Sequence, residues 1–117
     1  IYKGNFDDNN INGIGELKHS DGRLYKGSWK QGLKHGKGRF QWSDGRVYDG
    51  EYQNDQRTGY GVFLFANGDK YEGEYLAGRQ NGKGIFLDTQ GVKVYGIWKR
   101  GIMVKVTSGS GRELRMV

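Results

Sequence analysis

A 23-residue period constrains this chain more than any other feature of its sequence. The motif Tyr-x-Gly-x-aromatic recurs four times without insertion, and a fifth copy begins with Val instead of Tyr. The five copies start at Tyr2, Tyr25, Tyr48, Tyr71 and Val94. A fixed period of this length indicates an array of stacked units, each of which covers its apolar surface with its neighbours.

The second half of each of the first four copies also repeats. It holds a Gly-x-Gly pair, an apolar residue two positions later and a further glycine. The pairs are Gly13/Gly15, Gly36/Gly38, Gly59/Gly61 and Gly82/Gly84. The apolar residues are Leu17, Phe40, Phe63 and Phe86, and the further glycines are Gly22, Gly45, Gly68 and Gly91.

Both halves of a copy alternate as β-strands do. In residues 48–52 the aromatic residues and Gly50 share one face, and Asp49 and Glu51 share the other. Residues 59–65 alternate in the same way. We expect a polar loop at 30–35 between the strands of the second copy and a tight turn at 43–45 after them, so each copy is predicted to be a β-hairpin.

Charges on the polar face predict the register. A three-residue turn ending at Gly45 sets Phe40 opposite Tyr48. The same register sets three pairs of opposite charge across the strands: Arg39 and Asp49, Lys37 and Glu51, Glu16 and Lys26. Such pairs contribute roughly 0.2 to 1 kcal/mol each, whereas a one-residue slip would turn every side chain to the wrong face.

The predicted fold is all-β: an elongated single-layer antiparallel meander of five successive 23-residue hairpins, about 45 Å long if ten strands lie about 4.8 Å apart. Aromatic rings lie over strand glycines as a thin core. The array spans 1–106. The last hairpin is irregular, and its second strand around 102–106 is expected to act as a cap. Residues 107–117 are predicted to be a flexible C-terminal tail or linker.

Composition agrees with a folded chain. The mean hydropathy of −0.85 alone would suggest disorder, but eight Tyr, five Phe and three Trp are far more aromatic residues than disordered segments carry. Cysteine is absent, and neither a signal peptide nor an apolar run of about 18 residues is visible. We therefore expect an intracellular protein. Because the chain begins at Ile1 without an initiating Met, we expect it to be a piece of a longer one.

Catalytic and cofactor chemistry finds no support in the sequence. The two histidines, His19 and His35, lie in or beside predicted loops, and no Cys or G-x-S-x-G elbow supplies a nucleophile. Each Gly-x-Gly leads into a strand rather than a helix, which excludes a phosphate loop. Residues 8–13 resemble half of a calcium loop, but the twelfth position is His19 rather than Glu. We predict no enzyme activity, no metal, no cofactor, no small-molecule substrate and no nucleic-acid partner.

Taken together, the Tyr-x-Gly-x-aromatic opening, the Gly-x-Gly pair and the Asp/Asn-Gly turn at a period of 23 resemble the MORN repeat (membrane occupation and recognition nexus) over residues 2–104. This resemblance implies an elongated hairpin array without catalytic activity. It also implies a place in cytoskeletal, ciliary or junctional scaffolds, in the cytoplasm or at membranes. It further implies binding of a partner protein, often as a helix in the aromatic groove, or self-association.

The aromatic face is the predicted partner site, because exposed surface rich in Tyr and Trp is typical of protein interfaces. Trp42 and Phe65 do not recur, since other copies carry His19 and Asp88 there, so we expect these two to be selected for a partner. The predicted partner-binding residues are Tyr25, Trp29, Phe40, Trp42, Tyr48, Tyr52, Phe63, Phe65, Tyr71, Tyr75, Phe86 and Trp98.

An alternative function uses a basic edge. Lys30, Lys34, His35 and Arg46 could attract anionic phospholipids or phosphoinositides, at about 1 kcal/mol per cation near a membrane. Salt separates the two hypotheses, because lipid binding through cations weakens as ionic strength rises and groove binding responds little.

Overall fold

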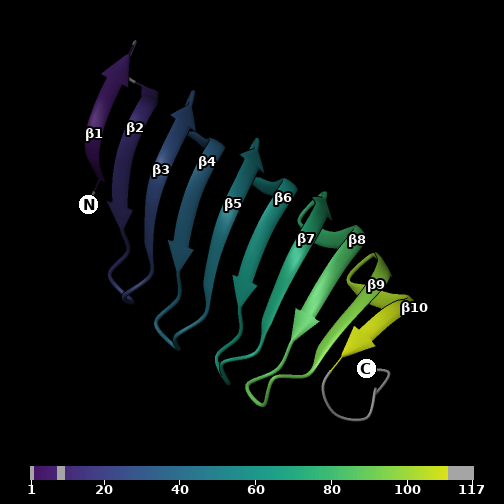
Figure 1. The fold of residues 1–117 in the computed structure, drawn as a ribbon. Coiled ribbons are helices and arrows are strands. Elements are labelled where there is room, and N and C mark those ends of the chain that lie inside the picture. Colours follow the sequence, from purple (N-terminus) through teal and green to yellow (C-terminus); the bar gives the residue numbers. More distant parts are fainter. Residues whose placement is uncertain (1, 8–9, 111–117) are drawn as a thin grey trace.

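A computed structural model describes the backbone of residues 2–7 and 10–110, and the side chains of 2–4 and 13–108. Ten strands lie side by side in chain order in one antiparallel sheet (Figure 1). They are β1 Tyr2–Asp7, β2 Asn10–Lys18, β3 Leu24–Lys30, β4 Leu33–Gln41, β5 Val47–Gln53, β6 Gln56–Leu64, β7 Lys70–Leu76, β8 Arg79–Leu87, β9 Lys93–Lys99 and β10 Ile102–Ser110. The extents are 53 × 24 × 16 Å. The predicted single-layer meander of hairpins is confirmed.

The register between β4 and β5 is the predicted one. Phe40 pairs with Tyr48, Arg39 with Asp49 and Lys37 with Glu51. The Arg39 and Asp49 side chains lie 3.7 Å apart. Glu51 instead turns its carboxylate to accept a hydrogen bond from the Tyr60 amide at 2.8 Å, so the charges opposite each other do not all form ion pairs.

The turn between two copies is also the expected one, since Trp42 N donates to Arg46 O at 2.9 Å and Gly45 has a φ of 98°. The turn inside the second copy differs from the prediction of a polar loop at 30–35. Lys30 ends β3 and Leu33 begins β4, so only Gln31 and Gly32 form the turn. Both have positive φ, 50° and 80°, as a two-residue hairpin turn that follows the twist of its strands requires.

Ala77 occupies the first position of the equivalent turn in the fourth copy, at a φ of 51° that strains an L-residue with no compensating side-chain hydrogen bond. We expect Ala77→Asn to raise the free energy of unfolding by about 0.5 to 1 kcal/mol, because Asn tolerates this conformation and Asn-Gly is the preferred pair here. Chemical denaturation measures the gain. Ala66→Asn is the control, because exposed Ala66 is not among the residues with positive φ. Equal gains in both variants would contradict the explanation by backbone strain.

A continuous row of glycines crosses the sheet at the level where the rings lie on it. Paired strand by strand, the row is Gly4, Gly15, Gly27, Gly38, Gly50, Gly61, Gly73, Gly84 and Gly96. In each of the first four hairpins, the opening tyrosine covers the two glycines of this row that its own hairpin contributes. A Cβ added at Gly38 would overlap the Tyr25 ring, whose hydroxyl donates to Ser28 O at 2.8 Å. The predicted packing of rings on glycines is confirmed.

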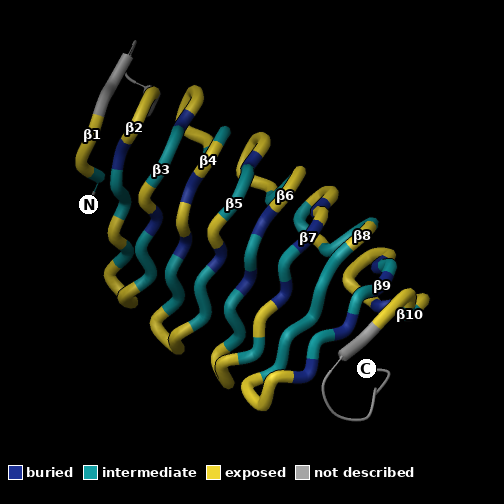
Figure 2. Tube along the Cα trace, in the orientation of Figure 1, coloured by how far each residue is buried: buried dark blue, intermediate teal, exposed yellow. Residues whose placement is uncertain are grey.

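Burial follows this row. Buried positions recur along strands β2 to β7, β9 and β10, whereas β8 is of intermediate burial over most of its length, and the turns are mostly exposed (Figure 2). The three side chains with less than 2 % of their surface exposed are the opening tyrosines Tyr25, Tyr48 and Tyr71. The core is therefore one layer of rings on bare backbone, with no second sheet among the described residues.

The fifth hairpin is irregular, as expected. Val94 stands in place of the tyrosine, and Met103 Sδ covers Gly96 instead. Two bulges interrupt the pairing of β10 with β9. Strand β10 continues to Ser110, four residues past the expected end of the array at 106, and residues 111–117 of the predicted tail lie outside the described residues.

Candidate interaction surface on the aromatic face

All twelve predicted partner-binding residues lie on one face, called here the aromatic face, but they differ in accessibility. Nine belong to the buried core: Tyr25, Trp29, Phe40, Tyr48, Tyr52, Phe63, Tyr71, Tyr75 and Trp98. The other three, Trp42, Phe65 and Phe86, are partly buried and pack against that core. A partner on this face would therefore meet mainly the latter three rings, together with whatever surrounds them.

Trp42 and Phe65 join the phenylalanines of neighbouring copies. The Trp42 ring lies 4.5 Å from Phe40 and 5.5 Å from Phe63, between centroids. Phe65 continues this ladder, 5.0 Å from Phe63 and 6.2 Å from Phe86. These two rings therefore stabilise the joints between copies as well as forming surface.

Two cations also lie on this face: Lys34, which the sequence placed on the basic edge of the lipid hypothesis, and Arg57, which the sequence did not single out. Lys34 Nζ lies 5.7 to 5.8 Å from the ring centroids of Tyr25, Phe40 and Tyr52. The Arg57 guanidinium lies equivalently one copy later, 5.5 Å from Tyr75. Such contacts contribute about 0.5 to 2 kcal/mol. The place of Lys34 follows from the length of the turn. A two-residue turn pairs Lys34 with Trp29, and residues paired directly across two strands point to the same face.

Asp55 holds Lys34 in place. Its carboxylate accepts from the Lys34 amide at 2.7 Å and lies 3.3 Å from Lys34 Nζ. Asp55 itself is in the left-handed region, with a φ of 71°, where the other three hairpin turns that the structure describes have glycine. The carboxylate contact with Lys34 offsets that backbone strain.

The residues of the lipid hypothesis do not gather at one edge. Lys30 is exposed at the end of β3. Lys34 lies over the rings, and half-buried His35 accepts from the Asn54 amide through Nδ1 at 3.5 Å. Arg46 lies beyond the opposite end of β4, with its guanidinium 4.9 Å from the Trp42 ring and 2.9 Å from Asp44.

Two hollows open on the aromatic face. One, of about 380 Å³, is lined by Lys34, Trp42, Asp55 and Arg57 among others. The other, of about 840 Å³, is lined mainly by apolar side chains: Phe65, Phe86, Trp98, Ile102 and Met103. Ile102 is 63 % exposed.

The buried tyrosines of this face have raised pKa values. Burial, with a contribution from the Asp55 charge, raises the pKa of Tyr25 to about 12. Burial likewise raises the pKa of Tyr75 to about 12, and it raises the pKa values of Tyr48, Tyr52 and Tyr71. These phenols are neutral at physiological pH. In the described part of the chain, no group of three or more His, Cys, Asp or Glu side chains could hold a metal ion.

Comparison with known proteins bears on this repeat directly. A family model for the MORN repeat matches residues 2–22, 25–45, 48–70 and 71–93, which are the first four hairpins. No curated protein matches the chain. No helix of the described residues is long and apolar enough to cross a membrane. With matches over most of its length and the hairpin sheet that the repeat predicts, the chain belongs to the MORN repeat family.

Proposed function

We propose that this array is a non-catalytic scaffold module whose aromatic face binds an amphipathic helix of a partner protein. MORN repeats are generally modules for interaction with proteins or membranes, and the repeat itself is not enzymatic. The observation that carries the proposal is the apolar hollow of about 840 Å³ between Phe65, Phe86 and Trp98. Well-packed apolar pockets of this kind receive the anchor residues of protein partners.

The aromatic face has one apolar hollow and one hollow lined by cations, which favours a helix that carries both apolar and acidic residues. An amphipathic helix presents anchors at i, i+3, i+4 and i+7, so apolar residues can enter the larger hollow. Lys34 and Arg57 line the smaller hollow, where acidic residues of the same helix would meet positive charge. The module is proposed to act in this way inside a larger intracellular protein of the cytoskeleton, the cilium or cell junctions.

The ring ladder provides the first test. The probes are helical peptides selected on the wild-type chain from a displayed library of amphipathic sequences. We expect the double variant Trp42→Ala/Phe65→Ala to bind them at least about tenfold more weakly, because loss of interface anchors has an effect of this size. Titration calorimetry measures the affinity. Tyr60→Ala is the control, because this 54 % exposed ring lies on the opposite face. Undiminished affinity in a folded Trp42/Phe65 variant would overturn the proposal.

The membrane alternative predicts different results. Lys30 remains exposed, but Lys34 and Arg46 already contact Asp55 and Asp44. Binding to vesicles with anionic lipid that survives Trp42→Ala and is abolished by Lys30→Glu would favour that alternative over the helix.

A further inference from the structure

The face opposite the aromatic rings, called here the back face, has a trough that crosses the last strands of the sheet. It is a depression of about 580 Å³ lined by residues of β6 to β10. Its floor is the backbone of Gly73, Gly84 and Gly96, and the residues before and after each glycine point to the back face on either side of the floor. Nothing in the described part of the chain covers this trough.

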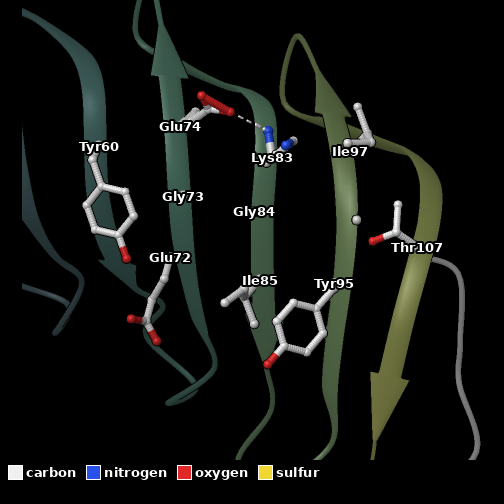
Figure 3. A pocket seen from close by; sticks show the side chains of 11 residues that line it. Tyr60, Glu72, Gly73, Glu74, Lys83, Gly84, Ile85, Tyr95, Ile97 and Thr107 are labelled. Carbon is white, nitrogen blue, oxygen red and sulfur yellow. Dashed lines mark hydrogen bonds between the residues drawn. The ribbon is translucent and has the colours of Figure 1, made fainter.

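The walls of the trough combine apolar and charged side chains. They are Glu72, Ile85 and Tyr95 on one side and Glu74, Lys83 and Ile97 on the other, as Figure 3 shows from close by. Tyr60, which is 54 % exposed, lies at the β6 end with its ring turned toward Glu72. A hollow lined by exposed rings and isoleucines is typical of a site for a partner or ligand.

The repeat does not require this lining. The glycine row crosses the whole sheet, so the same floor recurs in each copy. At the position of Ile85, however, the first two copies carry Glu16 and Arg39, and at the position of Tyr95 the second copy carries Lys26. The apolar walls are therefore a property of the last copies and not of the hairpin fold.

The width of the trough selects an extended ligand. The two walls are formed by residues two positions apart in each strand, so they stand about 7 Å apart. An α-helix with its side chains is about 10 to 12 Å wide and would lie above the walls rather than between them. A single extended chain fits between them.

The floor of the trough favours a ligand with few N–H groups. Strands β7, β8 and β9 each pair with a neighbour on both sides, so their backbone groups are engaged in the ladder. A ligand N–H pressed against this floor would lose its water without gaining a partner. Proline has no N–H, and a polyproline II helix needs no backbone pairing.

One end of the trough favours a basic residue. Across the described residues, no cation forms an ion pair with Glu72. Glu74 differs, because its carboxylate accepts a hydrogen bond from the Lys83 amide at 2.7 Å. An arginine can bind a carboxylate and stack on an aromatic ring at the same time, and Glu72 and Tyr60 offer both groups side by side.

We propose that this trough binds a proline-rich segment of a partner protein in the polyproline II conformation. A basic residue of the segment lies between Tyr60 and Glu72, and its apolar residues lie on Ile85, Tyr95 and Ile97. The distance from β6 to β10 is about 19 Å at about 4.8 Å per strand, which about six residues of polyproline II span at 3.1 Å each. The segment is already extended when free, so little conformational entropy is lost on binding.

Two synthetic peptides test the proposal, one for each chain direction: acetyl-Arg-Pro-Leu-Pro-Pro-Leu-Pro amide and acetyl-Pro-Leu-Pro-Pro-Leu-Pro-Arg amide. In an NMR titration of the 117-residue chain, at least one should shift the amides of Gly73, Gly84 and Gly96 saturably, with a Kd below about 1 mM. Replacing its Arg by Glu, or every Pro by Gly, should weaken binding at least about tenfold, because charge complementarity or pre-organisation is lost. Absence of saturable binding by both peptides, or equal binding of either control peptide, would overturn the proposal.

Two exposed residues of the back face form a matched pair of variants. Tyr60→Ala should weaken peptide binding at least about tenfold, because the ring that meets the basic residue is removed. Ile14→Ala is the control, because Ile14 is 66 % exposed and occupies the position of Tyr60 in the first copy, outside the trough. Circular dichroism checks that both variants are folded. Equal affinities of the two variants would contradict the proposed site.

Charge reversal locates the basic residue. Glu72→Lys should reverse the preference of the trough, so that the peptide with Glu binds more tightly than the peptide with Arg. A preference for Arg that survives Glu72→Lys would overturn the proposed place of the basic residue.

The trough and the proposed helix site lie on opposite faces, so the two proposals can fail independently. The double variant Trp42→Ala/Phe65→Ala should leave the affinity for the proline-rich peptide unchanged, because neither ring lines the trough. Loss of that affinity in the double variant, with Tyr60→Ala unaffected, would place the peptide on the aromatic face and overturn the proposal.

Discussion

Gly61→Ala should lower the free energy of unfolding by about 3 kcal/mol, the upper part of the range for overpacked cores. An added Cβ would come within 2.5 Å of the Tyr48 Cε1 and hydroxyl oxygen, while that hydroxyl is tied to Glu51 O at 2.8 Å. The ring cannot rise without losing this hydrogen bond and its contacts with Tyr52 and Tyr75. Urea denaturation measures the loss.

Gly78→Ala is the matched control for this prediction. Gly78 has a φ of 85°, but an added Cβ would meet nothing within 4 Å. Its cost should be about 1 to 2 kcal/mol from backbone conformation alone. If Gly61→Ala lowered the free energy of unfolding no more than Gly78→Ala does, packing of the Tyr48 ring on the glycine row would not be what stabilises the sheet. Tyr48→Leu should recover part of the loss in Gly61→Ala, since the obstructing ring is then absent.

Alkaline pH should unfold the array cooperatively. Burial raises the pKa of Tyr25 and Tyr75 to about 12, and it also raises the pKa values of Tyr48, Tyr52 and Tyr71. The folded state therefore favours the neutral phenol. Its stabilisation is complete below the ordinary tyrosine pKa of about 10 and is lost as pH rises toward 12. Tyrosinate absorbance and circular dichroism should change together in this interval.

Two phenylalanine variants check the origin of that transition. Tyr75 Oη is buried without a hydrogen-bond partner, so Tyr75→Phe should preserve stability at neutral pH and move the alkaline midpoint upward. Tyr48→Phe should instead cost about 1 kcal/mol at neutral pH, because it removes the bond to Glu51 O. Ionisation of the buried phenols near pH 10 with the sheet intact would contradict the account.

The repeat itself made most of the fold predictable. Period, alternation and turn glycine together fix the partner of every strand, and the charges on Arg39 and Asp49 exclude a slip by one residue. What could not be predicted depends on single residues at turns. Lys30 to His35 look like a loop because they are polar, yet only Gln31 and Gly32 need positive φ. Because the turn holds two residues rather than six, Lys34 belongs to strand β4 and points to the aromatic face.

The end of the array and its site were harder to predict for a related reason. Ser108 to Ser110 have the composition of a linker, but they pair with β9 because its edge offers hydrogen-bonding groups. Trp42 and Phe65 could be placed on the correct face from alternation alone. That each of these rings contacts two copies could not be predicted, because this contact depends on the spacing of copies in three dimensions.

Each of the four opening tyrosines also contacts an aromatic residue of the following copy. Between ring centroids, Tyr2 lies 5.6 Å from Trp29, Tyr25 lies 5.5 Å from Tyr52, Tyr48 lies 5.2 Å from Tyr75 and Tyr71 lies 4.9 Å from Trp98. Every joint thus includes a contact between the same two positions of the period, and duplication of any internal 23-residue segment would recreate that contact. Duplication can therefore lengthen this protein by one 23-residue copy at a time without a new kind of contact between copies. The length of the binding surface is therefore set by the number of copies that the gene encodes.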